Sequence, residues 1–580
     1  MVVLPISSAF SQDMKYVSKT SGDTLFVKDD IEYGGVNTLY LLMQSDTTAP
    51  ATRVYMLKSG GVYSLVNNPQ SSKAFKTIIM GPEQNPKTGT AQPPIITGAI
   101  GTTVNVTGGM TINKDLLVKN VDLEIGNANG GSGGWAWFNF GGDSLKLQVD
   151  NCIMEHTWWC WVGGPRAMQT IKFRNDYFVN LDGHSCRRNG GVVDFNSGSA
   201  FQQDTLLVEN CTHVNTQGTL YKFRTGYTVN RAIFNHNDFI DCAGYVIMNY
   251  GNQTNLSITN NIYVNTQLQA YCRDPLGIED TGPNADTLAM GLVNLLVDST
   301  FTANVATHGV YVDKNVTYWD SSLSDIVSTL NTNHINGSTE WVSQMITMNT
   351  RTEALFADKT TYPLLTNGKW ISKKPTFANT DVLFGSQLGI LKAYAIACVD
   401  TGYKSPLTSW RQASNPENAN FVHADWPIPI DLSYTDVDLL TAGLGGFPVG
   451  DLGWFPTQYA SWKAQESAEL ADIQHVLDNG GGPEVVRTTE QLPQEFRLAQ
   501  NYPNPFNPAT QIEYSIPKST FASIQVYDIL GREVAQLVNE MKQPGICSVR
   551  FDGANLPSGV YFYAIHAGDF HRVRKMLLIK

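Results

Sequence analysis

Short alternations of apolar and polar residues recur along the centre of the chain. Between residues 116 and 266 one phrase returns with small variations: apolar-x-apolar-x-Asn, two further residues, an aromatic residue, an apolar residue and a second Asn or Asp. The clearest copies occupy residues 171–180, 206–215, 232–241 and 256–265. A period of two is typical of β-strands. The phrase therefore predicts two short strands joined at an Asn corner.

The first Asn position of the phrase marks a repeat. It is occupied in turn by Asn120, Asn151, Asn175, Asn210, His236 and Asn260, at intervals of 31, 24, 35, 26 and 24 residues. Repeats of this length indicate an all-β solenoid, the right-handed parallel β-helix, in which each coil holds three short strands. We expect the six residues to stack at one corner as an Asn ladder, in the left-handed conformation that Asn tolerates. A β-sandwich would not explain the shared corner.

The pattern changes along the chain and divides it into segments. Helical periodicity replaces the phrase beyond residue 330, and one helix is predicted over Thr457–Leu477, ended by Gly480. A stretch with Gly and Pro then leads to a second alternating region. We expect a remnant signal peptide at 1–12, an N-terminal cap at 13–50, the β-helix at 51–330, a C-terminal flank with helices at 331–479, a linker at 480–494 and a β-domain at 495–580.

The last region begins with closely spaced prolines, Pro503, Pro505 and Pro508, which exclude a helix or a central strand. Apolar residues then alternate over residues 511–516. Further strand candidates follow at Ser523–Asp528, Ser548–Phe551, Gly559–Ile565 and Val573–Ile579. The pattern predicts a small β-sandwich of the immunoglobulin type.

Four phrases of this region resemble the C-terminal sorting domain of the bacterial type IX secretion system. They are NPFNPATQIEYSIP, VYDILGREV, LPSGVYFY and the basic-apolar tail from Arg572 to Lys580. The resemblance implies export across the outer membrane by the type IX machinery, followed by release or attachment at the cell surface. The expected location is therefore extracellular or on the outer cell surface, whatever the rest of the chain does.

Composition excludes some partners. The formal net charge of −12 argues against binding to nucleic acid. No apolar run reaches the length of about eighteen residues that a membrane-spanning helix requires, so none is expected. Residues 1–12 look like the end of a signal peptide, with Ala9 and Ser11 at the small-residue positions before a cleavage point at Gln12.

The eight cysteines suit an oxidising compartment. Cys152, Cys211 and Cys242 fall within apolar runs, where buried thiols and disulfides are equal alternatives. No CxxC pair occurs, so the sequence indicates neither a zinc knuckle nor a haem site, and no metal ligand set is predicted.

From about residue 50 to residue 320 the layout resembles the pectate-lyase-like superfamily, without a catalytic motif. Polysaccharide lyases of this fold use Arg or Lys as the base and calcium or other cations to neutralise the uronate. Glycoside hydrolases of this fold use two or three carboxylates about 5–10 Å apart. Calcium is therefore the cofactor that a lyase would imply, and no other is expected. RVYMLK, the Asn repeat, GDLGWFP and the sorting phrases together also resemble secreted bacterial β-helix proteins of unassigned function.

Ionisable residues gather in the loop after Asn180. They are Asp182, His184, Arg187, Arg188 and Asp194. The two arginines could neutralise a uronate, and the two aspartates could act as acid and base. A solvated loop of mixed charge is the simpler alternative.

Tryptophans cluster between the coils, at Trp135, Trp137, Trp158, Trp159 and Trp161. Exposed Trp faces stack on sugars, so these residues are candidates for carbohydrate binding. The same side chains also fit the interior of a solenoid.

Three functions follow from these features. The favoured one is a structural, adhesive or self-assembling surface protein, whose partners are copies of itself or an extracellular polysaccharide. The first alternative is a polysaccharide lyase or glycoside hydrolase, and the second is a non-catalytic carbohydrate-binding protein. Whether the chain is an enzyme stays open, and the absence of a paired-carboxylate signature favours the non-enzymatic function.

Overall fold

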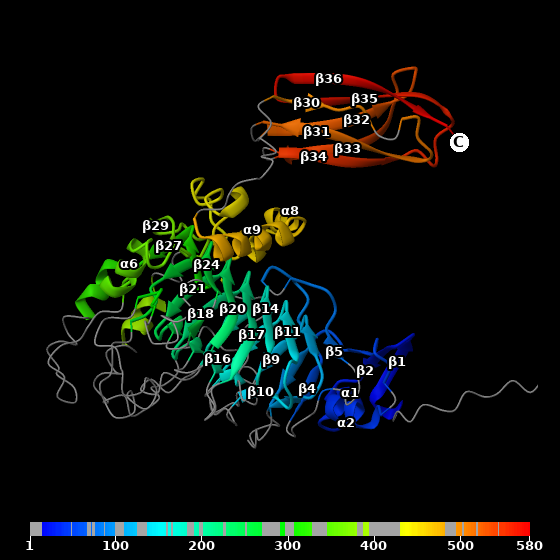
Figure 1. Cartoon of the computed structure of the whole chain (residues 1–580). Coiled ribbons are helices and arrows are strands. Elements are labelled where there is room, and N and C mark those ends of the chain that lie inside the picture. The colour runs from blue at the N-terminus through cyan, green and yellow to red at the C-terminus, as the bar shows by residue number, and fades with distance from the viewer. Residues whose placement is uncertain are drawn as a thin grey trace, which may run out of the picture. The chain divides into compact units, whose positions relative to one another are not determined.

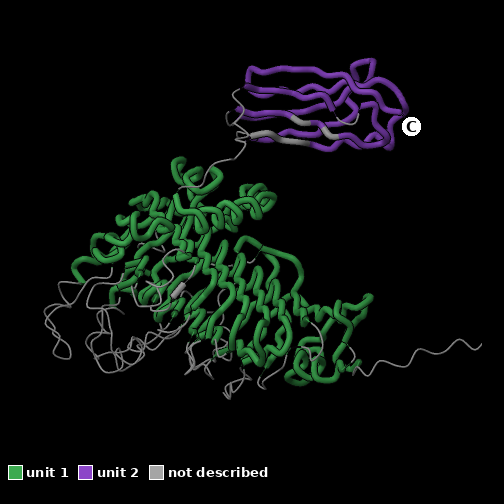
Figure 2. The backbone as a smooth tube through the Cα atoms, in the orientation of Figure 1, with its two compact units in different colours: residues 1–483 green, residues 484–580 purple. Residues whose placement is uncertain are grey.

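Three parallel sheets organise the first part of the chain (Figure 1). The chain divides into two units, residues 1–483 and residues 484–580 (Figure 2). The structure is a computed structural model that describes residues 14–47, 49–65, 71, 76–85, 87–98, 109–124, 136–157, 160–163, 166–181, 191–195, 201–223, 228–249, 252–253, 255–268, 291–295, 307–326, 345–379, 385, 387–393, 430–481, 495–501, 504–517, 520–542 and 545–579.

The three sheets of the first unit are named A, B and C. Sheet A contains β1 (Val17–Ser21), β2 (Thr24–Val27), β3 (Val54–Met56), β5 (Thr77–Met80), β8 (Leu116–Lys119), β11 (Lys146–Asp150), β14 (Thr170–Arg174), β17 (Gln202–Glu209), β20 (Thr228–Asn235), β24 (Asn255–Thr259), β26 (Gly309–Asp313) and β28 (Leu365–Asn367), with β23 (Asn252–Gln253) beside β20. Sheet B contains β4 (Val62–Ser64), β6 (Ile95–Thr97), β9 (Asp122–Glu124), β12 (Ile153–Glu155), β15 (Tyr177–Val179), β18 (Thr212–Thr216), β21 (Asp238–Cys242), β25 (Ile262–Val264), β27 (Asn315–Tyr318) and β29 (Trp370–Ser372). Sheet C contains β7 (Met110–Ile112), β10 (Ala136–Phe140), β13 (Cys160–Gly163), β16 (Gly191–Phe195), β19 (Tyr221–Phe223) and β22 (Ile247–Asn249).

Each coil takes one strand from each sheet. Strands β14, β15 and β16 form one coil, and β17 then returns to sheet A beside β14. The strands pair in register, so that Phe173 of β14 lies between Val149 of β11 and Val208 of β17. This mostly β architecture with long parallel sheets agrees with the predicted β-helix. Sheets A and B continue to β28 and β29, beyond the boundary expected at residue 330, because long insertions between the last strands hide the repeat in the sequence.

Side chains in register stack inside the coils. Phe178, His213, Phe239 and Tyr263 occupy equivalent inward positions on β15, β18, β21 and β25. Successive ring centroids lie 4.6, 4.5 and 5.1 Å apart, with interplanar angles of 8°, 21° and 9°. These distances follow the separation of about 4.8 Å between neighbouring strands. The parallel register therefore creates the stack.

The turn from sheet A to sheet B is made by a residue in the left-handed conformation. The φ angle is 58° at Asn120, 62° at Asn151, 58° at Asn175, 54° at Asn210, 54° at His236 and 58° at Asn260. These are the six residues of the predicted ladder, and Lys314 takes the same place in the next coil, with φ 60°. Asn and His tolerate this conformation better than most residues with a Cβ. This preference explains why Asn recurs at the corner.

The second Asn or Asp of the phrase makes the next corner, where sheet B ends. Asn180, Asn215, Asp241 and Asn265 have φ angles of 54°, 55°, 53° and 51°. One phrase thus encodes two left-handed corners with a short strand between them.

A second, fully buried amide ladder lies one residue after the first corner. Asn237 Nδ2 donates to Asn261 Oδ1 at 2.9 Å, and Asn261 Nδ2 donates to Asn315 Oδ1 at 3.0 Å. All three side chains are fully buried. Among the six corner residues, direct side-chain pairs join Asn151 to Asn120 at 2.6 Å and Asn260 to His236 at 3.2 Å. The corner residues share a backbone conformation, but their side chains mostly bind other segments.

A hairpin and short helices close the N-terminal end of the first unit. They are η1 (Met14–Tyr16), the antiparallel pair β1–β2, α1 (Asp30–Tyr33) and α2 (Thr38–Ser45). Leu39 and Leu42 of α2 are fully buried in the core of the first coils. Because β2 pairs in parallel with β3, this cap continues sheet A.

More helices lie between β27 and β28 and after β29. They are η2 (Ser321–Leu323), α6 (Thr350–Ala357), η4 (Leu444–Gly446), η5 (Leu452–Trp454), α8 (Pro456–Lys463) and α9 (Glu466–Asn479). The single helix predicted over Thr457–Leu477 is therefore two helices. Gln465 interrupts it with φ −123° and ψ 7°. The predicted stop at Gly480 is confirmed, since this glycine follows α9 with φ 66°.

The second unit consists of two antiparallel sheets around one core. One sheet contains β30 (Arg497–Leu498), β31 (Ala509–Ile516) and β34 (Gly545–Asp552), and the other contains β33 (Glu533–Lys542), β32 (Thr520–Tyr527), β35 (Gly559–Ala567) and β36 (Phe570–Leu578). Ile512, Ile524 and Tyr563 are fully buried in the core between them. Strand β33 was not among the strand candidates because Val538 is its one buried residue, so its alternation is weak.

His213 should make the stability of the first unit sensitive to acid. Burial lowers its pKa from 6.5 to about 3, so the unfolded chain accepts a proton that the folded chain resists. This contribution to stability is present above pH 6.5 and is lost as the pH falls toward 3, by about 1.4 kcal/mol per pH unit. We predict that His213→Phe, which keeps a ring in the stack, removes this loss in denaturant unfolding followed between about pH 7 and pH 4.

The variant also loses the contact of His213 Nε2 with the Tyr221 hydroxyl at 2.8 Å, which shifts its stability equally at each pH. His475→Ala, on the exposed side of α9, is the matched control and should keep the wild-type acid dependence. An unchanged acid dependence in His213→Phe would refute the prediction.

Candidate functional site

The C-terminal segment of the first unit, residues 430–481, covers the outer faces of sheets A and B. We call this segment the C-terminal cover. Leu432, Leu439 and Val449 pack on outward residues of sheet B such as Val214 and Ile240. On sheet A, Ile473 and Leu477 of α9 pack against Leu207 and Ile233. Figure 1 shows α8 and α9 lying beside the strands of sheet A.

The corner residues hold the backbone of the C-terminal cover. Asn210 Oδ1 accepts from Leu452 N at 3.2 Å, and Asn260 Oδ1 accepts from Leu444 N at 2.8 Å. Between them, His236 Nδ1 lies 3.2 Å from Gly450 O. The corner residues are required by the backbone turn. Their side chains also form hydrogen bonds with backbone groups of the C-terminal cover, which has little regular secondary structure in this part to satisfy them.

The motif Gly450–Trp454 inserts a buried ion pair beneath this row. Asp451 pairs with Lys87 from the loop between β5 and β6, and both side chains are fully buried. Lys87 Nζ also donates to Asn210 O at 2.8 Å, and Thr212 Oγ1 donates to Asp451 Oδ2 at 2.7 Å. Burial raises the pKa of Asp451, while the charge of Lys87 opposes that rise. Because a buried charge is costly unless it is paired, the two segments depend on each other.

Gly450 is required where the motif approaches sheet B. It has φ 86°, and a Cβ at this position would lie 2.2 Å from Asp238 Oδ1. A larger residue would push the motif away from the strand.

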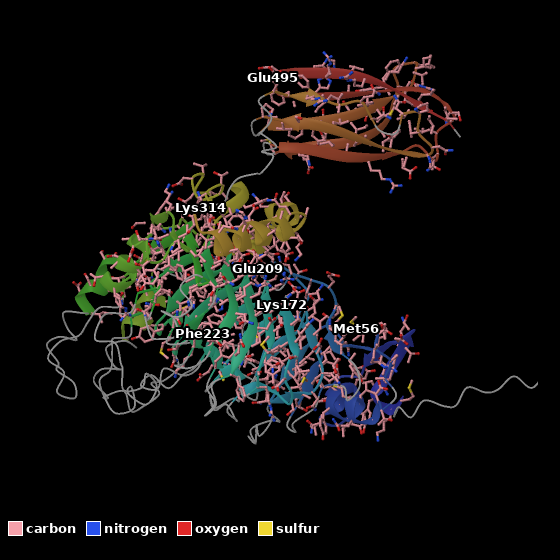
Figure 3. All side chains as sticks on the ribbon, in the orientation of Figure 1. Met56, Lys172, Glu209, Phe223, Lys314 and Glu495 are labelled. Atoms are coloured by element: carbon pink, nitrogen blue, oxygen red, sulfur yellow. The ribbon has the colours of Figure 1, made fainter. Side chains whose placement is uncertain are left out.

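A second charged cluster lies between sheet A and the helices of the C-terminal cover. Arg174 Nη2 is 2.8 Å from Glu466 Oε1, and Arg174 Nε is 3.4 Å from Glu209 Oε2. Lys463 Nζ also contacts Glu466, at 2.5 Å. Figure 3 labels Glu209 on β17 and Lys172 on the neighbouring strand β14. Arg174 thus joins one carboxyl group of the coils to one of the cover.

The two glutamates of this cluster have opposite pKa shifts. Burial raises the pKa of Glu209 to about 8 against the opposing charge of Arg174, and the hydrogen-bonded carboxylate of Glu466 adds to the rise. Burial also acts on Glu466, but the hydrogen bond from Lys463 and the charge of Arg174 outweigh it and lower its pKa. Near neutral pH, Glu209 is therefore the protonated partner and Glu466 the carboxylate.

His236 and Glu469 continue the cluster along the corner. His236 Nε2 is 3.1 Å from Glu469 Oε1, which also accepts from Asn235 Nδ2 at 2.9 Å. Burial alone would raise the pKa of Glu469, but its interactions with His236 and Asn235 lower it. The Trp462 ring packs edge-on against His236, with centroids 5.7 Å apart.

These acids have little room for a substrate. The side chains of Glu209 and Glu469 are each 1% exposed. A general acid or base must come within hydrogen-bond reach of the bond it acts on. In this structure the groups instead fasten the C-terminal cover to the coils.

For two of the candidate tryptophans, burial contradicts the predicted sugar binding. Trp137 and Trp161 are 3% and 0% exposed and pack together, with centroids 6.0 Å apart. They fill the solenoid, so neither presents a face to a sugar. The alternation along a strand shows which residues share a face, but it does not show which face points inward. Trp135, Trp158 and Trp159 lie outside the described residues.

Most of the candidate catalytic loop also lies outside the described residues, namely Asp182, His184, Arg187 and Arg188. Asp194 is described. It lies on β16, in register with Gly163 and Lys222 on the strands at either side, and it is buried. The pairing of Asp182 with Asp194 as acid and base therefore stays a prediction.

The sequence did offer a signal for the charged cluster that was missed. The residue directly before each corner is polar: Lys119, Asp150, Arg174, Glu209 and Asn235. Residues at this position share one edge of the outer face of sheet A. Their partners on α8 and α9 could not be inferred, because they come from a distant part of the chain.

Cys152, Cys211 and Cys242 are buried free thiols rather than disulfide partners, so the alternative left open for them is decided. Within the described ranges, no group of three or more His, Cys, Asp or Glu side chains is arranged to hold a metal ion. None of the helices that the structure describes is long and apolar enough to cross a lipid bilayer.

Comparison with known proteins identifies one region. Residues 500–580 match the family described as the secretion system C-terminal sorting domain. No curated protein and no solved structure matches the chain. The sorting-domain prediction is confirmed for these residues, and a type IX sorting domain indicates export to the cell surface or the extracellular space.

The opposite pKa shifts of Glu209 and Glu466 should give two different mutational effects. Since the pKa of Glu209 is raised, its contribution to stability is present below about pH 4.5 and is lost as the pH rises through about 8. Glu209→Gln cannot ionise, so we predict that it is less destabilised by alkali than the wild type. Glu466→Gln deprives Arg174 of its carboxylate and should cost about 1–3 kcal/mol at neutral pH.

Chemical denaturation of both variants at neutral pH and at about pH 9 measures these effects. Glu83→Gln, in the exposed ion pair with Lys119, is the control and should change stability by less than about 0.5 kcal/mol. Equal alkaline losses in Glu209→Gln and the wild type would exclude Glu209 as the protonated partner.

Proposed function

We propose that this chain is a secreted or surface-bound bacterial scaffold protein, with a structural, adhesive or self-assembling role and no catalytic one. The proposal rests on one observation: buried ionisable groups of the first unit bind the C-terminal cover to the coils. Lys87 and Asp451, Arg174 with Glu209 and Glu466, and His236 with Glu469 all fasten the C-terminal cover. Catalysis would need such groups to face a substrate.

The architecture supports a mechanical role. Coils that contact their neighbours through in-register strands make a body that is stiff along its axis. We assign right-handed winding to the coils, because connections between parallel strands of one sheet have this hand in about 98% of cases. We also assign a pectate-lyase-like solenoid to the first unit and an immunoglobulin-like sandwich to the second.

The proposed partners are the type IX secretion machinery during export and, afterwards, copies of the chain or an extracellular polysaccharide. The second unit supports the first step, since its residues 500–580 carry the sorting domain. Strands β5, β8 and β11 of sheet A, whose outward residues are partly exposed, would face the later partner. Residues 1–12 would act earlier, as the end of a signal peptide.

Removal of the second unit should separate export from folding. Each unit has its own hydrophobic core, so a chain ending at residue 483 is expected to fold and to remain in the periplasm. Cell fractionation with immunoblotting measures the location, and protease resistance measures the fold. The full chain is the control. Normal secretion of the shortened chain would refute the role of the second unit in export.

Incubation with polysaccharides tests the absence of catalysis. We expect the full chain to release neither unsaturated nor reducing ends from polyuronates or neutral polysaccharides, with or without calcium. Release that disappears in Asp182→Ala or Arg187→Ala would favour a lyase or hydrolase. Sedimentation of the chain with the same polysaccharides, and alone over a range of concentrations, distinguishes adhesion from self-assembly.

A further inference from the structure

Two histidines lie side by side on the outer face of the second unit. His566 of β35 and His571 of β36 are directly opposite in the antiparallel register. Both are exposed, and their ring centroids are 4.2 Å apart at an interplanar angle of 36°. Both lie within residues 500–580, which match the sorting domain, and the proposed scaffold role assigns no task to them.

The hairpin holds the two rings in place. A loop of two residues, Gly568 and Asp569, joins the strands, and Ala567 pairs with Phe570 at its base. In such a hairpin the pair that closes the loop is hydrogen-bonded and the next pair is not, and side chains approach most closely at a non-hydrogen-bonded pair. The buried neighbours Ile565 and Ala567 keep His566 on the outer face.

The immediate neighbours of the pair on the same face of the sheet are uncharged. On the same face, His566 is next to Ser523 of β32, and the following cross-strand pair is Ala564 with Val573. Lys575 lies one pair further along, opposite Phe562. Arg572 and Arg574 have the opposite strand parity, since they pair with Ile565 and Tyr563, whose side chains enter the core.

We propose that His566 and His571 form a two-imidazole site for a divalent late transition-metal ion of the Zn²⁺ class. Imidazole nitrogen is a preferred ligand of such ions. With Zn–N bonds of about 2.0–2.1 Å, two nitrogens on a tetrahedral ion lie roughly 3.3 Å apart. Rings whose centroids are 4.2 Å apart can supply that spacing by rotation about their side-chain bonds. Water fills the other positions of the ion.

Zinc titration of the full chain at neutral pH tests the site. Isothermal calorimetry should detect a Zn²⁺ site that each of His566→Ala and His571→Ala weakens on the order of tenfold or more, because one imidazole alone loses the chelate. His475→Ala, on the exposed side of α9, is the matched control and should leave the site intact. Thermal unfolding without metal checks that both variants keep the wild-type fold, and His566→Gln replaces His566→Ala if that one does not.

Electron paramagnetic resonance of the Cu²⁺-loaded chain gives an independent readout. Nitrogen hyperfine structure should change from two coupled imidazoles in the wild type to one in either single variant. The site is ruled out if Zn²⁺ does not bind, if binding survives both substitutions, or if His475→Ala weakens it as strongly. Retention of secretion by the variants would not bear on the metal, so this test is separate from that of the scaffold role.

Discussion

The left-handed corner between sheets A and B is the constraint on which the first unit depends. Each coil must turn sharply there without interrupting its hydrogen bonds to the next coil. The corner residues meet this need: Asn151 N donates to Arg174 O at 2.7 Å, and Asn175 N donates to Glu209 O at 3.1 Å. Most residues with a Cβ would lose about 1–2 kcal/mol in this conformation. Asn reduces that cost, and the same solution recurs in coil after coil.

The corner also sets what lies inside the coils. Because every coil turns at the same point, equivalent residues lie above one another at the strand spacing. The stack of Phe178, His213, Phe239 and Tyr263 and the ladder of Asn237, Asn261 and Asn315 both follow from this alignment. A buried amide is costly without partners. Here each Asn finds its partner in the equivalent residue of the next coil.

Outside the coils, the corner joins the C-terminal cover to the solenoid. Parallel sheets are normally covered on both faces, and the cover does this for much of sheets A and B. Many of the polar groups that it meets are corner residues or their neighbours, and these groups satisfy part of its irregular backbone and of its charges. Residues that resemble a catalytic set by type, such as Glu209, Glu466 and His236, are thereby used for attachment. The second unit has its own core and carries the sorting domain.

The sequence by itself determined what depends on local chemistry. The tolerance of the corner residues for the left-handed conformation is a property of single residues. The alternation of apolar and polar side chains around them is a property of single strands. Both could therefore be read in order along the chain. The sorting phrases could be recognised in the same way, whereas β33, with one buried residue, left no local pattern to recognise.

The tertiary structure alone decided which distant groups meet. Arg174 pairs with Glu466, and Lys87 with Asp451, because the C-terminal cover returns across coils formed much earlier in the chain. No period in the sequence encodes that path. The sequence left open whether Trp137 and Trp161 are exposed or buried, since that depends on which face of sheet C the coils enclose. The conformational preference of a residue depends on that residue and its neighbours in the sequence. Burial and charge pairing depend on contacts between distant segments, which form only in the folded chain.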